Sequence, residues 1–544
     1  PLARAGLIAD VVIDAKQVGV YSNTDLPVTI TWLDGDDFSS VMSHINGTLG
    51  VTDDILTSYT NATGDAGADG ISGSVNLFNV TANTKSFIGD GAAVNITGAT
   101  AGSWSPMLDS GDNNSHGTSG TYTTVQPVFD QPVSVLATRN IETLNFGGNL
   151  SIFLNGAGGT NEDAASVGAT YSSVNYDGDT IAGIGDEGTV TSDKGAEVKA
   201  KAIDKAINVS PTAGRGGGVA ISGMVALYDL DTRVHASIAS TAKVSATSLD
   251  LTANQVENIG TVAGALMVGN ENSVGGMETT NTILTHVAAY IGDNSQDDTS
   301  NSASLIPNFT APTAGVTITG GTVNLAAAET GIVQSLAVSL EVGDDAALGA
   351  SISVNNINDD VTTSIDNATV TAKNVYLNSN ADDTIHTIAM GASGSGDIAF
   401  AGSAATANIS PSVYAMIDNN SVVTADDNVG VIAVNEDEIE TIAGAGAIGI
   451  ESGGIGLSVV VNQIDGNTIA SISNSTVDAN GFDGNDSFAV NTGELVDAPD
   501  VSSISAPSAF TPSLAEKRKN VSGLAVVATS DQAVAANAGT FGGG

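Results

Sequence analysis

A short phrase of small apolar residues that ends in isoleucine recurs along the whole chain. Its seven copies end at Ile88, Ile184, Ile238, Ile291, Ile365, Ile417 and Ile472. Successive copies are 96, 54, 53, 74, 52 and 55 residues apart, which indicates a unit of about 53 residues that carries insertions in places. Repetition on this scale is typical of stacked arrays, in which each unit buries its apolar face against its neighbours. We therefore expect an extended object built of copies rather than a globule around one pocket.

The composition suits the thin core of such an array. Hydrophobic residues make up 41% of the chain but aromatic residues only 4%, and 64 of the 544 residues are glycine. A large globular core normally uses more Phe, Tyr and Trp, because these side chains bury the most surface. Ala, Val, Ile and Leu instead fit the narrow space between stacked strands.

The charge excludes two classes of partner. Fifteen basic residues against 60 acidic ones give a net charge of −45. Nucleic-acid binding needs Lys and Arg on phosphates, and adhesion to anionic membranes needs basic clusters, so neither is expected. The acidic excess keeps an exposed surface soluble through self-repulsion, or it binds divalent cations.

Cysteine is absent, which excludes disulfides and thiolate metal sites. No apolar run reaches the roughly 18 residues of a membrane span, so no span is expected. The sequence begins with Pro1 and shows no signal peptide. These features predict a processed or excerpted piece whose export signals lie outside it.

The unit from 369 to 419 shows the expected local structure most clearly. Alternation of apolar and polar residues predicts four strands, at 370–377, 384–392, 398–409 and 412–417. Polar residues at 378–383 predict a turn, and Gly, Ser and Asp at 394–397 predict a second break. No helical period occurs in it.

These patterns predict an all-β fold, a β-solenoid, in the form of a right-handed parallel β-helix with about seven repeats. A repeat of about 53 residues would make two coils of roughly 26 residues each, and about fourteen coils stacked at ~4.8 Å would give a rod of roughly 65–70 Å. A sandwich or barrel would explain the strands and turns but not the fixed repeat.

The excess length enters at one side of the predicted solenoid. The units are predicted at 1–88 with an insertion at 26–70, 89–184 with an insertion at 90–130, 185–291 as two compact repeats, 292–365 with an insertion at 293–315, 366–477 as two compact repeats, 478–520 as an insertion, and 521–544 as a truncated repeat. Three insertions follow the repeat's Ile, so they emerge at one corner. Their aromatic residues either pin the loops to the solenoid as small cores or contact a partner, which could be a surface, a glycan or a protein.

One polar position recurs inside the apolar strands, nine or ten residues before each Ile. It holds Asn79, Asn175, Asp229, Asn281, Asn355, Asn408 and Asn462. A buried amide is unfavourable unless it is hydrogen-bonded, and stacked copies can pair along the axis as in the Asn ladders of cross-β structures. We therefore predict a structural Asn/Asp column rather than a binding site.

Signals for catalysis or cofactors are sparse. The five His residues are scattered singly and no nucleophile elbow occurs, so no catalytic or cofactor-binding residue is predicted. Acidic pairs occur at 36–37, 297–298, 344–345, 359–360, 382–383 and 426–427, and turn positions would explain them. Calcium ions could bind at Asp34, Asp36 and Asp37 or at Asp483, Asn485 and Asp486, although neither segment continues into an EF-hand loop.

The unit VxAxxVxL…TIAGAGAxG…GxSVxVNxI…TxAxI is clearest at 423–472 and 370–417. It resembles the β-strand repeats of bacterial surface and secreted proteins of the filamentous adhesin/haemagglutinin kind, including leukotoxin-like filamentous adhesins. The resemblance implies a non-enzymatic, rod-like, extracellular or cell-surface segment of a prokaryotic adhesin. A second reading is a self-assembling subunit of an extracellular filament or sheath, and a third is a polysaccharide-degrading β-helix enzyme. The expected partners are neighbouring repeats of a longer chain or further copies of this one.

Overall fold

A computed structural model describes residues 2–8, 11–26, 56–61, 70–99, 103–104, 128–148, 165–292, 314–481, 487–495 and 516–544. In these residues the regular structure is β-strand and no helix occurs. Two large sheets are built from parallel strand pairs, so the all-β class and a solenoid-like parallel stacking are confirmed. No helix able to cross a membrane is found in this described part of the chain.

The first sheet, called sheet A, contains ten strands in the described residues. They are β1 (Leu2–Leu7), β5 (Gly70–Ile88), β8 (Ser166–Ile184), β11 (Val219–Ile238), β14 (Asn272–Gly292), β17 (Ala346–Asp366), β19 (Ile398–Ile409), β20 (Ser412–Asp418), β22 (Gly453–Ile464) and β23 (Asn467–Ile472). Their order across the sheet follows the order in the sequence, as expected when each unit is laid on the previous one.

The second sheet, called sheet B, contains fifteen strands in the same described ranges. Its long or central strands are β3 (Val18–Leu26), β4 (Leu56–Asn61), β7 (Val133–Gly148), β10 (Ala196–Gly216), β13 (Leu249–Gly269), β16 (Thr322–Gly343), β18 (Ala368–Ser395), β21 (Val422–Gly449) and β27 (Leu524–Gly543). Its short strands are β2 (Val12–Ala15), β6 (Ala93–Ile96), β9 (Thr189–Ser192), β12 (Lys243–Ala246), β15 (Ala314–Ile318) and β24 (Thr476–Ala479). Outside both sheets, β25 (Phe488–Leu495) and β26 (Glu516–Val521) form an antiparallel pair.

Strand pairing shows that one repeat forms one coil. Ala196 of β10 pairs with Leu249 of β13, and Val219 of β11 pairs with Asn272 of β14, so hydrogen-bonded neighbours are a whole repeat apart. Each coil has one long strand in sheet B and one long strand, or two shorter ones in line, in sheet A. The expectation of two coils of about 26 residues in each repeat is therefore wrong.

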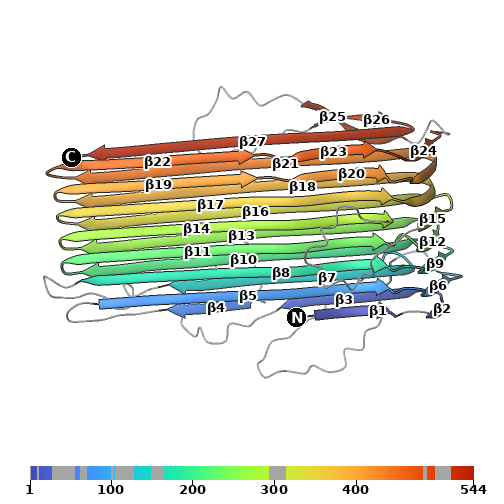
Figure 1. Cartoon of the computed structure of the whole chain (residues 1–544), viewed down its shortest axis with the longest axis horizontal. Helices are drawn as coiled ribbons and strands as arrows, with labels where there is room; N and C mark the ends of the chain where they lie inside the picture. Colours follow the sequence, from blue (N-terminus) through green and yellow to red (C-terminus); the bar gives the residue numbers. More distant parts are fainter. Residues whose placement is uncertain are drawn as a thin grey trace, which may run out of the picture.

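The overall shape differs from the expected rod for the same reason. The strands lie along the longest axis of the molecule, and the coils stack across it from the first residues to the last (Figure 1). A strand of 21 residues such as β13 is about 70 Å long, whereas eight strands of sheet A stacked at ~4.8 Å span only about 34 Å. The described coils form a broad, flat slab.

The strand boundaries explain the error in coil size. The expected third and fourth strands of the unit at 369–419 agree closely with β19 and β20. However, the polar residues at 378–383 form no turn, because β18 continues through them with alternate side chains buried. The two strands expected on either side are one strand, so the coil is twice as wide as predicted.

The recurring isoleucines stack in register at one end of the slab. Each pairs with the next copy along sheet A, from Ile88 through Ile184 and onward to Ile472. The first six are at most 1% exposed. They belong to the largest apolar core of the described residues, together with Val and Ala of the short sheet B strands. We call this end the isoleucine corner.

Two of the expected insertions meet the slab at this corner, next to the short strands. The insertion predicted at 90–130 includes the short strand β6, and the insertion predicted at 293–315 extends into the first two residues of β15. Aromatic contacts occur beside the coils, since Trp104 packs against Phe129 at 4.8 Å and Phe488 packs against Tyr376 at 5.2 Å, measured between ring centroids. Phe129 is 1% exposed and also packs against Tyr21 of β3, so its ring is held against the coils.

At the opposite end, turns of two or three residues join sheet B to sheet A, at 217–218, 270–271, 344–345, 396–397 and 450–452. We call this the turn end. The core there is built from small side chains, with a cluster of Ala399, Ala401, Ala445 and Ala447. Between the two ends, buried polar groups alternate with a second apolar cluster that includes Ile259, Val333 and Ile357. In the earlier coils Met224 and Met277 are buried toward the turn end.

Candidate functional site

The interior of the slab holds a cluster of four carboxyl groups. Glu257 of β13, Glu329 of β16 and Asp383 of β18 project from sheet B, and Asp359 of β17 projects from sheet A. All four residues are at most 1% exposed. One oxygen from each of Glu329, Asp359 and Asp383 lies within 4.8 Å of the other two. We call these four residues the carboxylate cluster.

The register of sheet B explains how the cluster forms. Gly331 of β16 pairs directly with Glu257 on one side and with Asp383 on the other. A Cβ atom added at Gly331 would lie 2.7 Å from an Asp383 oxygen and 3.0 Å from a Glu329 oxygen. The glycine therefore leaves the space in which the carboxyl groups meet.

Burial dominates the electrostatics of the cluster. It raises the pKa of Glu257 to about 8 and that of Asp383 to about 7, in both cases with further contributions from nearby acids. Burial also raises the pKa of Glu329 and of Asp359 well above the usual range, and the adjacent carboxylates add to this effect. None of the four forms an ion pair with a basic residue in the described ranges.

A buried ion pair lies next to the cluster toward the first coils. Arg139 of β7 donates to Asp204 of β10 at 2.6 Å, and Gln255 donates to the same carboxylate oxygen at 2.7 Å. Burial works against the charge of Arg139, but Asp204 and neighbouring groups raise its pKa overall. The contrast with the carboxylate cluster is plain: Asp204 has a cation, and the four acids beyond it do not.

The seven predicted Asn/Asp residues lie on both faces of sheet A rather than in one column. The residues that lie nine positions before their Ile point outward. These are Asn79, Asn175, Asp229 and Asn408. The residues that lie ten positions before their Ile point into the slab. These are Asn281, Asn355 and Asn462. Side chains alternate along a strand, so one residue of difference changes the face.

Amide ladders nevertheless occur within each set. Asn175 donates to Asn79 at 2.9 Å on the outer face, and Asn281 donates to Asn355 at 2.6 Å inside. The inner pair also bridges the two sheets, because Thr261 donates to Asn281 at 2.5 Å and Asn355 donates to Thr387 at 2.6 Å. These bonds satisfy buried polar groups and hold the sheets together.

The acidic pairs at 359–360, 382–383 and 426–427 lie within strands, not in turns as expected. In each of the first two pairs one residue points inward, which is how Asp359 and Asp383 reach the cluster. The pair at 344–345 does lie in a turn. The pairs at 36–37 and 297–298, and both expected calcium segments, at 34–37 and 483–486, lie outside the described residues.

The cluster had a signal in the sequence. Asp359 is an even number of residues before Ile365, and Asp383 is an even number after Val375, so each shares the inward face of its apolar neighbour. Glu257 has the same relation to Leu249, and Glu329 to Leu325. An acid that lies an even number of positions from a core residue in the same strand is therefore predicted to be buried. Assigning these acids to turns leads to the opposite prediction, that they are exposed.

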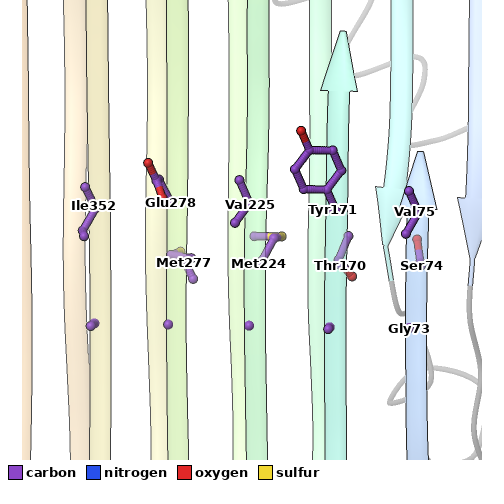
Figure 2. A pocket seen from close by; sticks show the side chains of 14 residues that line it. Gly73, Ser74, Val75, Thr170, Tyr171, Met224, Val225, Met277, Glu278 and Ile352 are labelled. Atoms are coloured by element: carbon purple, nitrogen blue, oxygen red, sulfur yellow. The ribbon is translucent and has the colours of Figure 1, made fainter. Parts of the chain in front are cut away.

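The outer face of sheet A carries a second feature, a shallow groove near the turn end. Its floor is a row of small residues that pair in register across five strands: Gly73, Ala169, Gly223, Gly276 and Ala350. Figure 2 shows the adjacent row, in which Val75, Tyr171, Val225, Glu278 and Ile352 project beside it. The groove has a volume of about 750 Å³.

Apolar side chains surround the groove and continue on the other sheet. Another row of sheet A consists of Ile71, Val167, Ile221, Val274, Leu348, Phe400 and Ile455, and six of these seven are 37–82% exposed. The outer face of sheet B at the same end exposes Val262, Leu340, Val342, Ile388, Met390, Ile442 and Ile448. Contiguous exposed apolar surface of this kind commonly marks a contact surface.

Comparisons with known proteins give no family for this chain. No protein-family model, no curated protein and no solved structure matches it.

Proposed function

We propose that this chain is a non-enzymatic, extracellular structural segment of a prokaryotic cell-surface adhesin, in which stacked coils act as a spacer. The observation that carries the proposal is the uncovered core of the last coil. Val429, Val431 and Ile439 of β21 point inward and are 0% exposed. Their partners in β27 are Leu524, Val526 and Val534, and these are 47%, 42% and 55% exposed.

A further coil of the same kind would cover these side chains. It would also pair the free edge of β27, whose backbone groups otherwise face solvent. The slab thus favours continuation by more solenoid, which neighbouring repeats of a longer adhesin would supply. We propose a right-handed winding for the whole stack, because crossovers between parallel strands are overwhelmingly right-handed.

A second copy of the chain could cover the same edge, and this supports the alternative of a subunit that stacks end to end into a filament or sheath. The opposite end of the stack is also incompletely covered, because inward-facing Leu7 and Ala15 are only partly buried while their partners Ile88 and Ile96 are 0% exposed. Two open, apolar ends are what such a subunit needs.

We assign the adhesive contact to the loops at the isoleucine corner and to the apolar outer faces at the turn end. Side chains on these faces repeat at the strand spacing of about 4.8 Å, so a flat partner surface could touch many of them at once. Each contact would be weak, but the array would add them together.

Electron microscopy of the native material distinguishes the two readings. Isolated projections from a far larger polypeptide support the adhesin, whereas regular fibres with a subunit-length axial repeat support the filament. Hydrolysis of a polysaccharide by the purified chain would overturn both.

Sedimentation velocity tests the uncovered core directly. The double variant Val526→Asp/Val534→Asp should remove any end-to-end assembly of the purified chain. Val262→Asp/Val342→Asp, which places the same two charges on an outer face where these residues are already 40% and 43% exposed, should leave that assembly intact. Equal effects of both changes would contradict the role of the end coil.

A further inference from the structure

The carboxylate cluster lacks the groups that normally compensate buried acids. One oxygen from each of Glu329, Asp359 and Asp383 meets the other two inside the slab, and neither oxygen of these three residues accepts a hydrogen bond from a donor in the described residues. Bringing several carboxylates out of water without a cation is strongly unfavourable. Because no basic residue in the described ranges pairs with these acids, a bound cation or protons must balance their negative charge.

Glu257 gives a separate indication of what the cluster lacks. Its carboxyl group adjoins that of Glu329, and Thr285 donates to one of its oxygens at 2.9 Å. Its other oxygen, Oε2, is buried and has no partner. Glu257 therefore places a buried, unpaired acceptor beside Glu329, where it can serve as a fourth ligand of a shared cation.

The acids are close enough together to share one ion. Calcium binds oxygens at 2.3–2.6 Å, so two ligands on opposite sides of the ion are about 4.6–5.2 Å apart. Oxygens of Glu329, Asp359 and Asp383 lie within 4.8 Å of one another. Gly331 keeps this space free, because a side chain there would enter it.

We propose that Glu257, Glu329, Asp359 and Asp383 bind a divalent cation, Ca²⁺, inside the solenoid. The donor atoms are all carboxylate oxygens with no nitrogen or sulfur, which selects hard cations. Four carboxylates can supply six to eight ligands without water, as Ca²⁺ accepts but Mg²⁺, which retains waters in a strict octahedron, does not. The ion joins three strands of sheet B to one strand of sheet A.

Proton sharing among the acids is the competing explanation, and it predicts opposite results. If protons alone neutralise the cluster, Ca²⁺ changes nothing, and acidification stabilises the protein. If Ca²⁺ is bound, protons compete with it, so acidification removes the ion and its stabilising effect.

The test uses the whole purified chain. Because the site is buried, the protein is unfolded with a chelator and refolded in parallel with CaCl₂ or with EGTA. After desalting in 0.3 M NaCl to remove ions held only by the acidic surface, bound calcium is measured by mass spectrometry. We expect at least one Ca²⁺ per chain after refolding with CaCl₂, and a higher melting temperature than after refolding with EGTA.

Two variants control for the high surface charge. Glu329→Gln/Asp359→Asn/Asp383→Asn should lose the retained calcium and the shift in melting temperature. Asp344→Asn/Asp345→Asn, which removes two acids from a turn, should keep both. The triple variant is isosteric and relieves buried charge, so it is expected to fold.

Calcium retention by the triple variant equal to that of the wild type would overturn the proposal. So would a wild-type protein that retains no calcium after refolding with CaCl₂ and whose melting temperature is the same as after refolding with EGTA. The wild-type measurements stand alone if the triple variant fails to fold. Refolding with MgCl₂ in place of CaCl₂ should give no comparable shift.

Discussion

A single buried glutamate near the turn end makes stability depend on pH in a way that can be calculated. Glu341 of β16 projects inward between two glycines of sheet A, Gly275 and Gly349, and a Cβ atom at either would lie 1.9 Å from its carboxyl oxygens. It is 0% exposed, and no basic residue in the described ranges pairs with it. Burial raises the pKa of Glu341 to about 8, partly opposed by the Ser339 hydroxyl.

The direction and size of the effect follow from proton binding. Between its ordinary pKa of 4.5 and the folded value of about 8, the folded protein holds a proton that the unfolded chain releases. The stabilisation is therefore complete below pH 4.5 and is lost as the pH rises through 8. At 1.36 kcal/mol per pKa unit, the loss is about 3 kcal/mol at pH 7 and about 5 kcal/mol at pH 9.

The variant Glu341→Gln keeps the shape and removes the titration. The free energy of unfolding of the variant and of the wild type is measured by urea denaturation at pH 4, 7 and 9. The difference, variant minus wild type, should be larger than at pH 4 by about 3 kcal/mol at pH 7 and by about 5 kcal/mol at pH 9. Glu278→Gln on the outer face of β14 is the control and should follow the wild-type curve. A constant difference between Glu341→Gln and wild type at all three pH values would refute the reasoning.

Three further changes test the interior by their effect on urea denaturation. Ile238→Ala removes a 0% exposed member of the isoleucine column and should cost about 2–5 kcal/mol of stability; less than 1 kcal/mol would contradict the packing. Asn281→Ala leaves buried partners unpaired and should cost about 1–3 kcal/mol, whereas Asn175→Ala on the outer face should cost under about 0.5 kcal/mol. Equal losses would contradict the division of the Asn/Asp residues into an inner and an outer set. Gly331→Ala places a Cβ atom 2.7 Å from a carboxyl oxygen and should cost about 1–3 kcal/mol, while Gly264→Ala, with no atom within 4 Å, should cost under 1 kcal/mol; the reverse order would contradict the crowding.

The repeat and the parallel all-β architecture could be predicted from the sequence because both depend on local patterns. The isoleucine phrase marks the same register position in every coil, so its recurrence is visible without a structure. The width of the coil was not visible in the same way. The polar residues at 378–383 resemble a turn, but they lie in a long strand in which alternate residues are buried. Some of the buried ones are polar, because the interior of the slab is partly polar there.

The site was missed for a related physical reason. Asp359 and Asp383 each adjoin an outward-facing acid, and a pair of aspartates favours a turn when neighbours alone are considered. Which residue faces inward depends on phase with core residues six or eight positions away. Assembly of the cluster further depends on pairing between residues a whole repeat apart, which local patterns do not encode.

The one-coil repeat has a consequence for how the chain tolerates added length. From β5 onward, every strand pairing in sheet A closes a loop of one repeat, usually 52–55 residues, but 74 residues between Ile291 and Ile365 and 96 between Ile88 and Ile184. Chain entropy grows only with the logarithm of loop length, so these longer loops cost about 0.3 and about 0.5 kcal/mol more than a compact repeat. Adding a segment at the isoleucine corner therefore scarcely slows or weakens closure of the next coil. Sequence at that corner can change in length and kind while the folding of the slab remains a repetition of the same step.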